Sequence, residues 1–206
     1  HNTFVILCLL AAVELCAATT DPEKTRQLVA VVQSQADLSA RARALQQLAI
    51  VGSAETVPVL AGLLADDKLA LYARDVLQVM PDARAGVALR EALTRLQGKF
   101  LIGAIHSIGL RQDGEAADAL VRLSAGRDPE VAGAALRALG RIGTPAAIRA
   151  LDQALARGPA ELRAAAAEGS LLCADRFLDA GKRPEAVGLY DAVRRSELPE
   201  PLRVAA

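Results

Sequence analysis

The chain has 206 residues, 52% of them hydrophobic, so it is long enough to bury a core of ordinary size. Lysine and arginine number 24, as do aspartate and glutamate, so the chain has no net charge to attract a polyanion. Aromatic residues make up only 2%, too few for the stacking platforms of single-strand nucleic-acid binders. Nucleic-acid binding is therefore disfavoured, and a composition rich in alanine and leucine predicts an all-α protein.

Residues 1–20, HNTFVILCLLAAVELCAATT, are typical of a secretory signal peptide that lacks its charged leader. The apolar run, interrupted only by Glu14, is too short to span a bilayer, and small residues suited to signal-peptidase cleavage follow it. A buried first helix is the alternative, and a lipoprotein is weaker because Glu14 and Leu15 precede Cys16 where small residues are required. We predict that residues 1–18 are removed and that the mature chain is exported, to the periplasm or the extracellular space.

The chain is expected to belong to a longer polypeptide, because it begins with His1 and its last residues, RVAA, read as the middle of a helix. After removal of residues 1–18, Cys173 remains as a single cysteine, so no disulfide can form within one chain.

A leading helix is predicted within residues 19–38, with Asp21 as its N-cap and Pro22 at its first position. Helical hairpins are predicted to follow near residues 39–65, 68–97, 99–125, 128–157 and 159–195. Pro58 lies beyond the tolerated first turn of its helix, so a kink or a late helix start is expected there.

The prediction of these hairpins comes from an internal repeat with a period of about thirty residues. Polar residues suited to cap a helix recur at this period: Ser53, Asp82, Asp113 and Thr144. Five residues before each cap stands an aliphatic residue: Leu48, Leu77, Ile108 and Leu139. Seven residues after each cap stands a leucine: Leu60, Leu89, Leu120 and Leu151. An aliphatic residue, a turn, a cap and a buried leucine describe a helical hairpin.

Glycines accompany the predicted turns, and we expect them to end the first helix of each hairpin in the left-handed conformation. They are Gly52, Gly109, Gly140 and Gly143. Because a single hairpin of about thirty residues cannot hide its apolar face alone, the repeat predicts stacked hairpins that complete one another's core, which is a solenoid.

The segments ALQQLAIVGSAETVPVLAGLL, IHSIGLRQDGEAADALVRL and ALRALGRIGTPAAIRAL resemble HEAT repeats of the short bacterial kind, related to the HEAT-like repeats of phycobiliprotein lyases. The resemblance covers residues 39–158. It implies a right-handed α-solenoid of stacked helical hairpins, an armadillo-type superhelix, and it brings no catalytic motif with it.

The last part of the chain, residues 159–206, departs from this pattern. LLCADRFLDAGKRPEAVGLYDAV, with Gly181 in the turn and Ala186 and Tyr190 four residues apart, resembles one tetratricopeptide hairpin. The start of a further repeat is expected after it, cut at Ala206.

Residues suited to catalysis or metal binding are few. His106 is the one histidine left after signal removal, and we expect it to be partly buried and hydrogen-bonded rather than a metal ligand or a base. Cys173 lies on an apolar helix and is expected to behave as a small hydrophobic residue. Asp66 and Asp67 are expected to cap a helix rather than to bind calcium. GRIGTP lacks the lysine of a phosphate-binding loop. We predict no enzyme activity, no metal and no cofactor.

Polar residues on the second helices form the candidate binding site. With the repeat leucines pointing inward, these side chains face away from at least part of the core. By the HEAT resemblance they would line a concave protein-binding strip: Arg90, Glu91, Asp118, Arg122, Arg149, Asp152 and Gln153. The alternative is a solvated face held by local pairs such as Arg149 with Asp152.

We therefore predict a non-catalytic protein-interaction or spacer scaffold, exported as part of a longer polypeptide, whose partner is a protein, a peptide or another domain of the same polypeptide. No membrane span is expected in the mature chain. The alternative is an accessory repeat domain of a secreted enzyme whose catalytic domain lies beyond Ala206, and the downstream sequence would discriminate the two. A chromophore lyase, suggested by the repeat's relatives, is disfavoured by the export signal and the single histidine.

Overall fold

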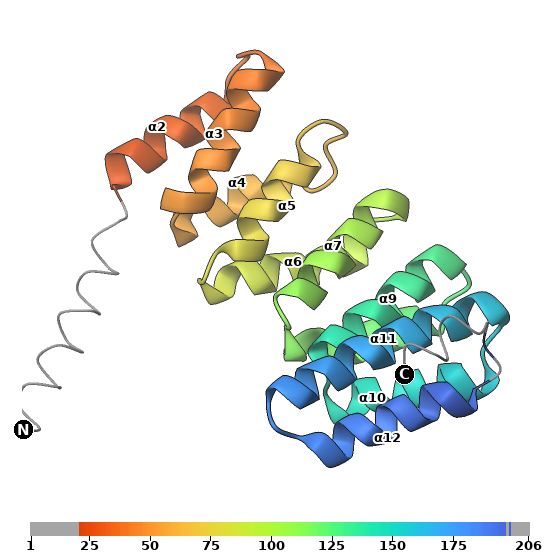
Figure 1. The fold of residues 1–206 in the computed structure, drawn as a ribbon. Helices are drawn as coiled ribbons and strands as arrows, with labels where there is room; N and C mark the ends of the chain where they lie inside the picture. The colour runs from red at the N-terminus through yellow and green to blue at the C-terminus, as the bar shows by residue number, and fades with distance from the viewer. Residues whose placement is uncertain (1–20, 197, 199–206) are drawn as a thin grey trace, which may run out of the picture. The chain divides into compact units, whose positions relative to one another are not determined.

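The computed structural model describes residues 21–196 and residue 198. The predicted signal peptide at residues 1–18 and the predicted further repeat after Pro199 lie outside these residues. In the described part of the chain, the regular elements are α-helices and two short 3-10 turns, without any strand, so the predicted all-α fold is confirmed (Figure 1). None of the helices in that part is long and apolar enough to cross a membrane.

The contacts divide the chain into two compact units, His1–Ala85 and Gly86–Ala206. The elements of the first unit are α2 (Pro22–Gln33), α3 (Leu38–Val51), the 3-10 turn η1 (Ala54–Thr56), α4 (Val57–Gly62) and α5 (Ala70–Val79). The chain passes into the second unit within α6 (Ala83–Arg95). There follow α7 (Gly98–Leu110), the 3-10 turn η2 (Gly114–Ala116), α8 (Ala117–Ser124), α9 (Pro129–Ile142), α10 (Pro145–Arg157), α11 (Ala160–Asp179) and α12 (Arg183–Arg195). A pair of helices occupies every predicted hairpin range.

The predicted caps begin the second helices, with one exception. Asp82 accepts a hydrogen bond from the backbone N–H of Arg84, Asp113 from that of Glu115 and Thr144 from that of Ala147. Each bond satisfies a donor that the first turn of a helix leaves unpaired. The side chain of Ser53 makes no such bond, and its carbonyl oxygen accepts from Thr56 instead.

The expected late start at Pro58 is confirmed. The 3-10 turn η1 precedes α4, which places Pro58 within the first two positions of the α-helix. At that place the missing N–H of proline removes no helical hydrogen bond.

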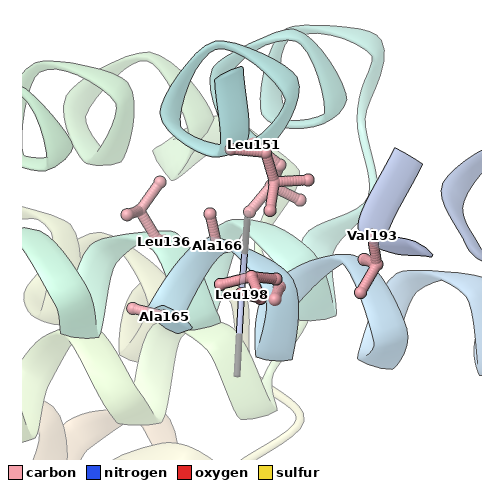
Figure 2. Close-up of a cluster of buried hydrophobic side chains, with 8 residues drawn as sticks. Leu136, Leu151, Ala165, Ala166, Val193 and Leu198 are labelled. Carbon is pink, nitrogen blue, oxygen red and sulfur yellow. The ribbon is translucent and has the colours of Figure 1, made fainter. Parts of the chain in front are cut away.

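The repeat leucines form the core as predicted. Leu60, Leu89, Leu120 and Leu151 are each 0% exposed, and their four aliphatic counterparts on the first helices are equally buried. Figure 2 shows one such cluster, in which Leu151 of α10 and Leu136 of α9 lie around the small side chains of Ala165 and Ala166 on α11. In this cluster, the apolar stripes of neighbouring hairpins of the second unit share one core.

The second unit is a two-layered stack. Its first helices α7, α9 and α11 pack side by side most extensively, with α9 in the middle, while the second helices α8, α10 and α12 follow one another in a thinner layer. An ion pair between Arg137 of α9 and Glu168 of α11 joins neighbouring first helices. This arrangement is the stacked-hairpin solenoid that the sequence predicts.

The four glycines were expected to end the first helices in the left-handed conformation, and the structure confirms this for one of them. Gly143 ends α9 in the left-handed conformation, with φ of 65°, as expected. Gly109 and Gly140 lie inside their helices instead, and the left-handed residue after α7 is Gln112, with φ of 54°. A Cβ atom on Gly109 would lie 2.9 Å from the Cα atom of Ala138 on α9. These internal glycines therefore serve the close approach of neighbouring helices.

The same closeness recurs one repeat later. A Cβ atom on Gly140 would overlap the backbone of Gly169 on α11, and one on Gly169 would lie 2.7 Å from the carbonyl oxygen of Leu136. Gly52 also differs from the expectation, since it ends α3 in extended backbone with φ of −64°.

The first unit begins with an antiparallel helix pair. The hydroxyl of Thr25 on α2 donates to the carbonyl of Val51 at the end of α3, over 3.1 Å. At the other end of the pair, Nε of Arg41 donates to the carbonyl of Val32 over 2.8 Å. These bonds satisfy helix-terminal carbonyls of both α2 and α3, and α5 packs on α3 as the next first helix.

Truncating the core leucines tests the inward face. Leu151→Ala and Leu120→Ala should each lower the free energy of unfolding by about 2–5 kcal/mol, because each leaves a cavity in a closed core. Arg149→Ala, on the exposed side of α10, should change it by less than about 0.5 kcal/mol. Urea denaturation measures all three, and equal losses would contradict this assignment of the buried stripe.

Substitution of two glycines in the middle of helices, Gly169 and Gly188, tests whether close packing of neighbouring helices requires glycine. Gly169→Ala should destabilise by about 1–3 kcal/mol, because its Cβ would press on the backbone of α9. Gly188→Ala, where a Cβ meets no atom within 4 Å, should stabilise by about 0.5–1 kcal/mol through helix propensity. The comparison uses the same denaturation experiment. The same sign for both substitutions would show that close helix approach does not require glycine at position 169.

Candidate protein-binding site

The candidate strip occupies equivalent positions of successive repeats. Glu91, Arg122 and Gln153 follow one another at the repeat period, and each stands two residues after a buried repeat leucine. Asp118 and Arg149 are another pair separated by one period. Since equivalent residues of stacked hairpins lie on the same side of the stack, the repeat itself directs these side chains outward.

On α8 and α10 the charged side chains of the strip are exposed. Asp118 and Arg122 lie one turn apart on α8, and Arg149 lies on the exposed side of α10. No ion pair or hydrogen bond joins any of them to another described residue, and the local pair considered between Arg149 and Asp152 does not form. Both signs of charge are therefore available to a partner.

Arg90 occupies a different environment. Its guanidinium contacts the carboxylate of Asp113 at 2.5 Å and that of Glu115 at 2.8 Å, and its side chain is 25% exposed. Asp113 is at the same time the cap of η2. Arg90 thus ties α6 to the start of the next second helix, while its neighbour Glu91 is exposed.

Asp152 and Gln153 lie on opposite flanks of α10. Gln153 lines a cavity of about 200 Å³ between α8 and α10, together with Val121 and Ser124. Asp152 faces the other way, into a groove between α10 and α12. The strip therefore continues into two grooves, one on each side of the same helix.

The groove between α10 and α12 consists of two cavities. One, of about 530 Å³, lies near the start of α10 and is lined by Ile148, Phe177 and Leu189 among others. The other, of about 610 Å³, lies near the end of α10 and is lined by Leu155 and Ala192 among others. Asp152 and Gly188 line both cavities.

Although the side chain of Asp152 is exposed, desolvation by the atoms around it raises its pKa above the ordinary value, since desolvation disfavours the charged carboxylate. Asp66 shows the opposite effect in the first unit. Its side chain accepts backbone hydrogen bonds from Lys68 and Leu69, both at 2.8 Å, and the bond from Lys68 contributes most to lowering its pKa. Asp66 therefore caps the turn at residues 67–69 that leads into α5, whose N-cap is Leu69, and this corrects the expectation that Asp66 caps a helix.

The other residues considered for catalysis or metal binding are Cys173 and His106. Cys173 is buried and not joined in a disulfide, and its burial raises the pKa of its thiol. His106 is exposed on α7, which corrects the expectation of partial burial. Among the residues that the structure describes, no group of histidine, cysteine and carboxylate side chains is arranged to hold a metal ion.

The groove between α10 and α12 was not anticipated from the sequence. One signal for it was present, because Gly188 lies in the middle of a predicted helix without a turn to justify it. The carboxylate of Asp152 was singled out, but the repeat alone could not show that it faces α12 rather than α8.

Comparison with known families agrees with this architecture. The family model for HEAT repeats matches residues 87–171, a range that begins in α6 and ends within α11. No curated protein matches the chain.

The two aspartates give a prediction about pH. In a carboxyl NMR titration, Asp152 should titrate above the ordinary aspartate pKa and Asp66 below it. By linkage, ionised Asp66 stabilises the fold above its unfolded-state pKa, and this contribution is lost as the pH falls through its lower folded-state pKa. Asp152 acts in the opposite sense, since its charge opposes folding once the pH exceeds its unfolded-state pKa, and protonation relieves this. Indistinguishable titration of the two carboxyls would contradict the described environments.

Proposed function

Because residues 87–171 match HEAT repeats, we propose that this chain is a non-catalytic scaffold that binds a protein partner through the outward faces of its second helices. HEAT repeats are protein-interaction units, and this is the class of function that the match supports. The finer proposal, that the strip residues on α8 and α10 carry the binding, rests on their exposure and on their lack of partners among the described residues.

The observation that carries the proposal is the set of unpaired charges at equivalent positions of adjacent repeats. Asp118, Arg122 and Arg149 are held on rigid helices by the buried leucines Leu120 and Leu151. Because the helices already hold the backbone of these residues in place, a partner has to order only their side chains. Both signs occur together, which favours a folded protein or a peptide over a nucleic acid or an anionic membrane.

We also propose that the chain is exported as part of a longer polypeptide. The support for export is the composition of residues 1–18, which lie outside the described residues. N-terminal sequencing of the protein recovered from the source cells tests the proposal, and an intact N-terminus that still carries residues 1–18 would contradict it.

Charge reversal tests the strip. The double variant Arg122→Glu, Arg149→Glu in the full-length gene product should lose specific partners from a quantitative pull-down, because it places like charges against the partner surface. Its melting temperature should fall by no more than a few degrees, since both side chains are exposed and make no ion pair in the described chain.

The matched control is Arg43→Glu, Arg127→Glu, which changes the net charge equally at exposed residues outside the strip. Proteins retained by the wild type and by this control, but lost by the strip variant, are the expected partners. Identical sets from all three proteins would remove the strip from the binding site.

A further inference from the structure

One face of α11 is apolar along the whole length of the helix. Its residues recur at spacings of three and four, which place them on one side of a helix: Ala160, Ala164, Ala167, Leu171, Ala174 and Leu178. Leu178 is 44% exposed at one end of this apolar face, and Ala160 is exposed at the other. Apolar side chains at this spacing are typical of a helix that packs on another element.

The first helices before α11 show which contact such a face makes. The face of α9 that packs on α11 consists of two glycines and a leucine: Gly133, Leu136 and Gly140. Their counterparts one repeat period later belong to the apolar face of α11: Ala164, Ala167 and Leu171. Because α9 packs on α7 and α11 packs on α9, the apolar face of α11 occupies the position on which a further first helix would pack.

The chain after α12 returns to this face. Leu198 is 8% exposed and belongs to one buried cluster with Ala167 of α11 and Val193 of α12 (Figure 2). Leu162 and Leu171 of α11 pack against the same cluster. The segment that follows Leu198 therefore starts beside the apolar face of α11.

The residues after Leu198 repeat the sequence at the start of α11. Residues 199–206, which lie outside the described residues, have the sequence PEPLRVAA, and residues 159–166 have the sequence PAELRAAA. The first proline, the leucine, the arginine and the last two alanines occupy the same positions in both segments. Pro159 is the N-cap of α11, so this sequence is the one that begins a first helix.

We propose that residues 199–206 pack on the apolar face of α11 as the beginning of a further first helix. The register follows from the interface between α9 and α11, where Gly133 lies against Ala165. Ala164 is the counterpart of Gly133 on the apolar face, and Ala205 is the counterpart of Ala165 in the matching segment. Ala205 therefore lies against Ala164.

A disulfide tests this contact. A Cβ atom on Gly133 would lie 3.5 Å from the Cβ atom of Ala165, a separation that a disulfide spans. The double variant Ala164→Cys, Ala205→Cys should therefore form an intramolecular disulfide under mild oxidation, identified by peptide mass spectrometry. The experiment uses the whole chain with serine in place of Cys8 and Cys16, while the buried Cys173 is kept.

The matched control is the pair Ala134→Cys, Ala205→Cys in the same background. Ala134 is partly exposed on α9, so a thiol at this position is accessible to an oxidant. Since α11 would lie between α9 and the further helix, the two cysteines of the control cannot meet. The disulfide of the test pair should form at least about tenfold faster than that of the control pair.

A second pair of variants tests the same orientation without oxidation. Leu202 is the counterpart of Leu162, which packs against the cluster of Leu198, and Val204 is the counterpart of Ala164 on the apolar face. Leu202→Ser should lower the melting temperature by at least about 3 °C, because it removes a leucine that packs on α11. Val204→Ser, on the side turned away from α11, should change it by less than about 1 °C.

Three outcomes would overturn the proposal. The first is disulfide formation at equal rates in the test pair and the control pair, and the second is an equal melting temperature for Leu202→Ser and Val204→Ser. The third is a disulfide-linked dimer of the test pair, which would assign the apolar face of α11 to a second copy of the chain. None of the substituted residues belongs to the charged strip, so this test and the charge reversal of the strip give separate results.

Discussion

Close backbone contact between successive first helices is the constraint on which the second unit depends. Gly109 lies against Ala138, and Gly140 lies against Gly169, at separations that leave no room for a Cβ atom. At this distance the leucines of each hairpin reach the alanines of the next, as Leu151 does with Ala165 and Ala166 in Figure 2. The small residues of the first helices thus allow neighbouring hairpins to pack closely.

The second helices of the second unit make fewer contacts with one another than the first helices do. Each of α8, α10 and α12 is fixed by a buried leucine, while the contacts between successive second helices are sparse. The consequence is a surface of exposed charges, interrupted by grooves on both flanks of α10. A closely packed layer of first helices thus lies beneath a more loosely packed layer of second helices.

The two sides of this surface differ in their electrostatics. On α8 and on the exposed side of α10, charges of both signs stand in solvent, where pairing with a partner contributes more to orientation and association rate than to affinity. In the groove between α10 and α12, Asp152 is exposed as well, but desolvation raises the pKa of its carboxyl, so its surroundings differ from those of the charges on α8.

The sequence by itself determined the helical hairpins, their boundaries and the buried leucines, because caps and apolar residues that recur at a nearly constant period are local signals. The tertiary structure decided the roles of residues that depend on a neighbouring hairpin. Gly109 and Gly140 matched the pattern of turn glycines, yet they serve helix contacts whose partners lie about one repeat away in the chain. Likewise, Arg90 matched the pattern of a surface residue but pairs with Asp113 and Glu115. The groove beside Asp152 exists only because α10 and α12 both pack on α11, a relation between helices that no local pattern records.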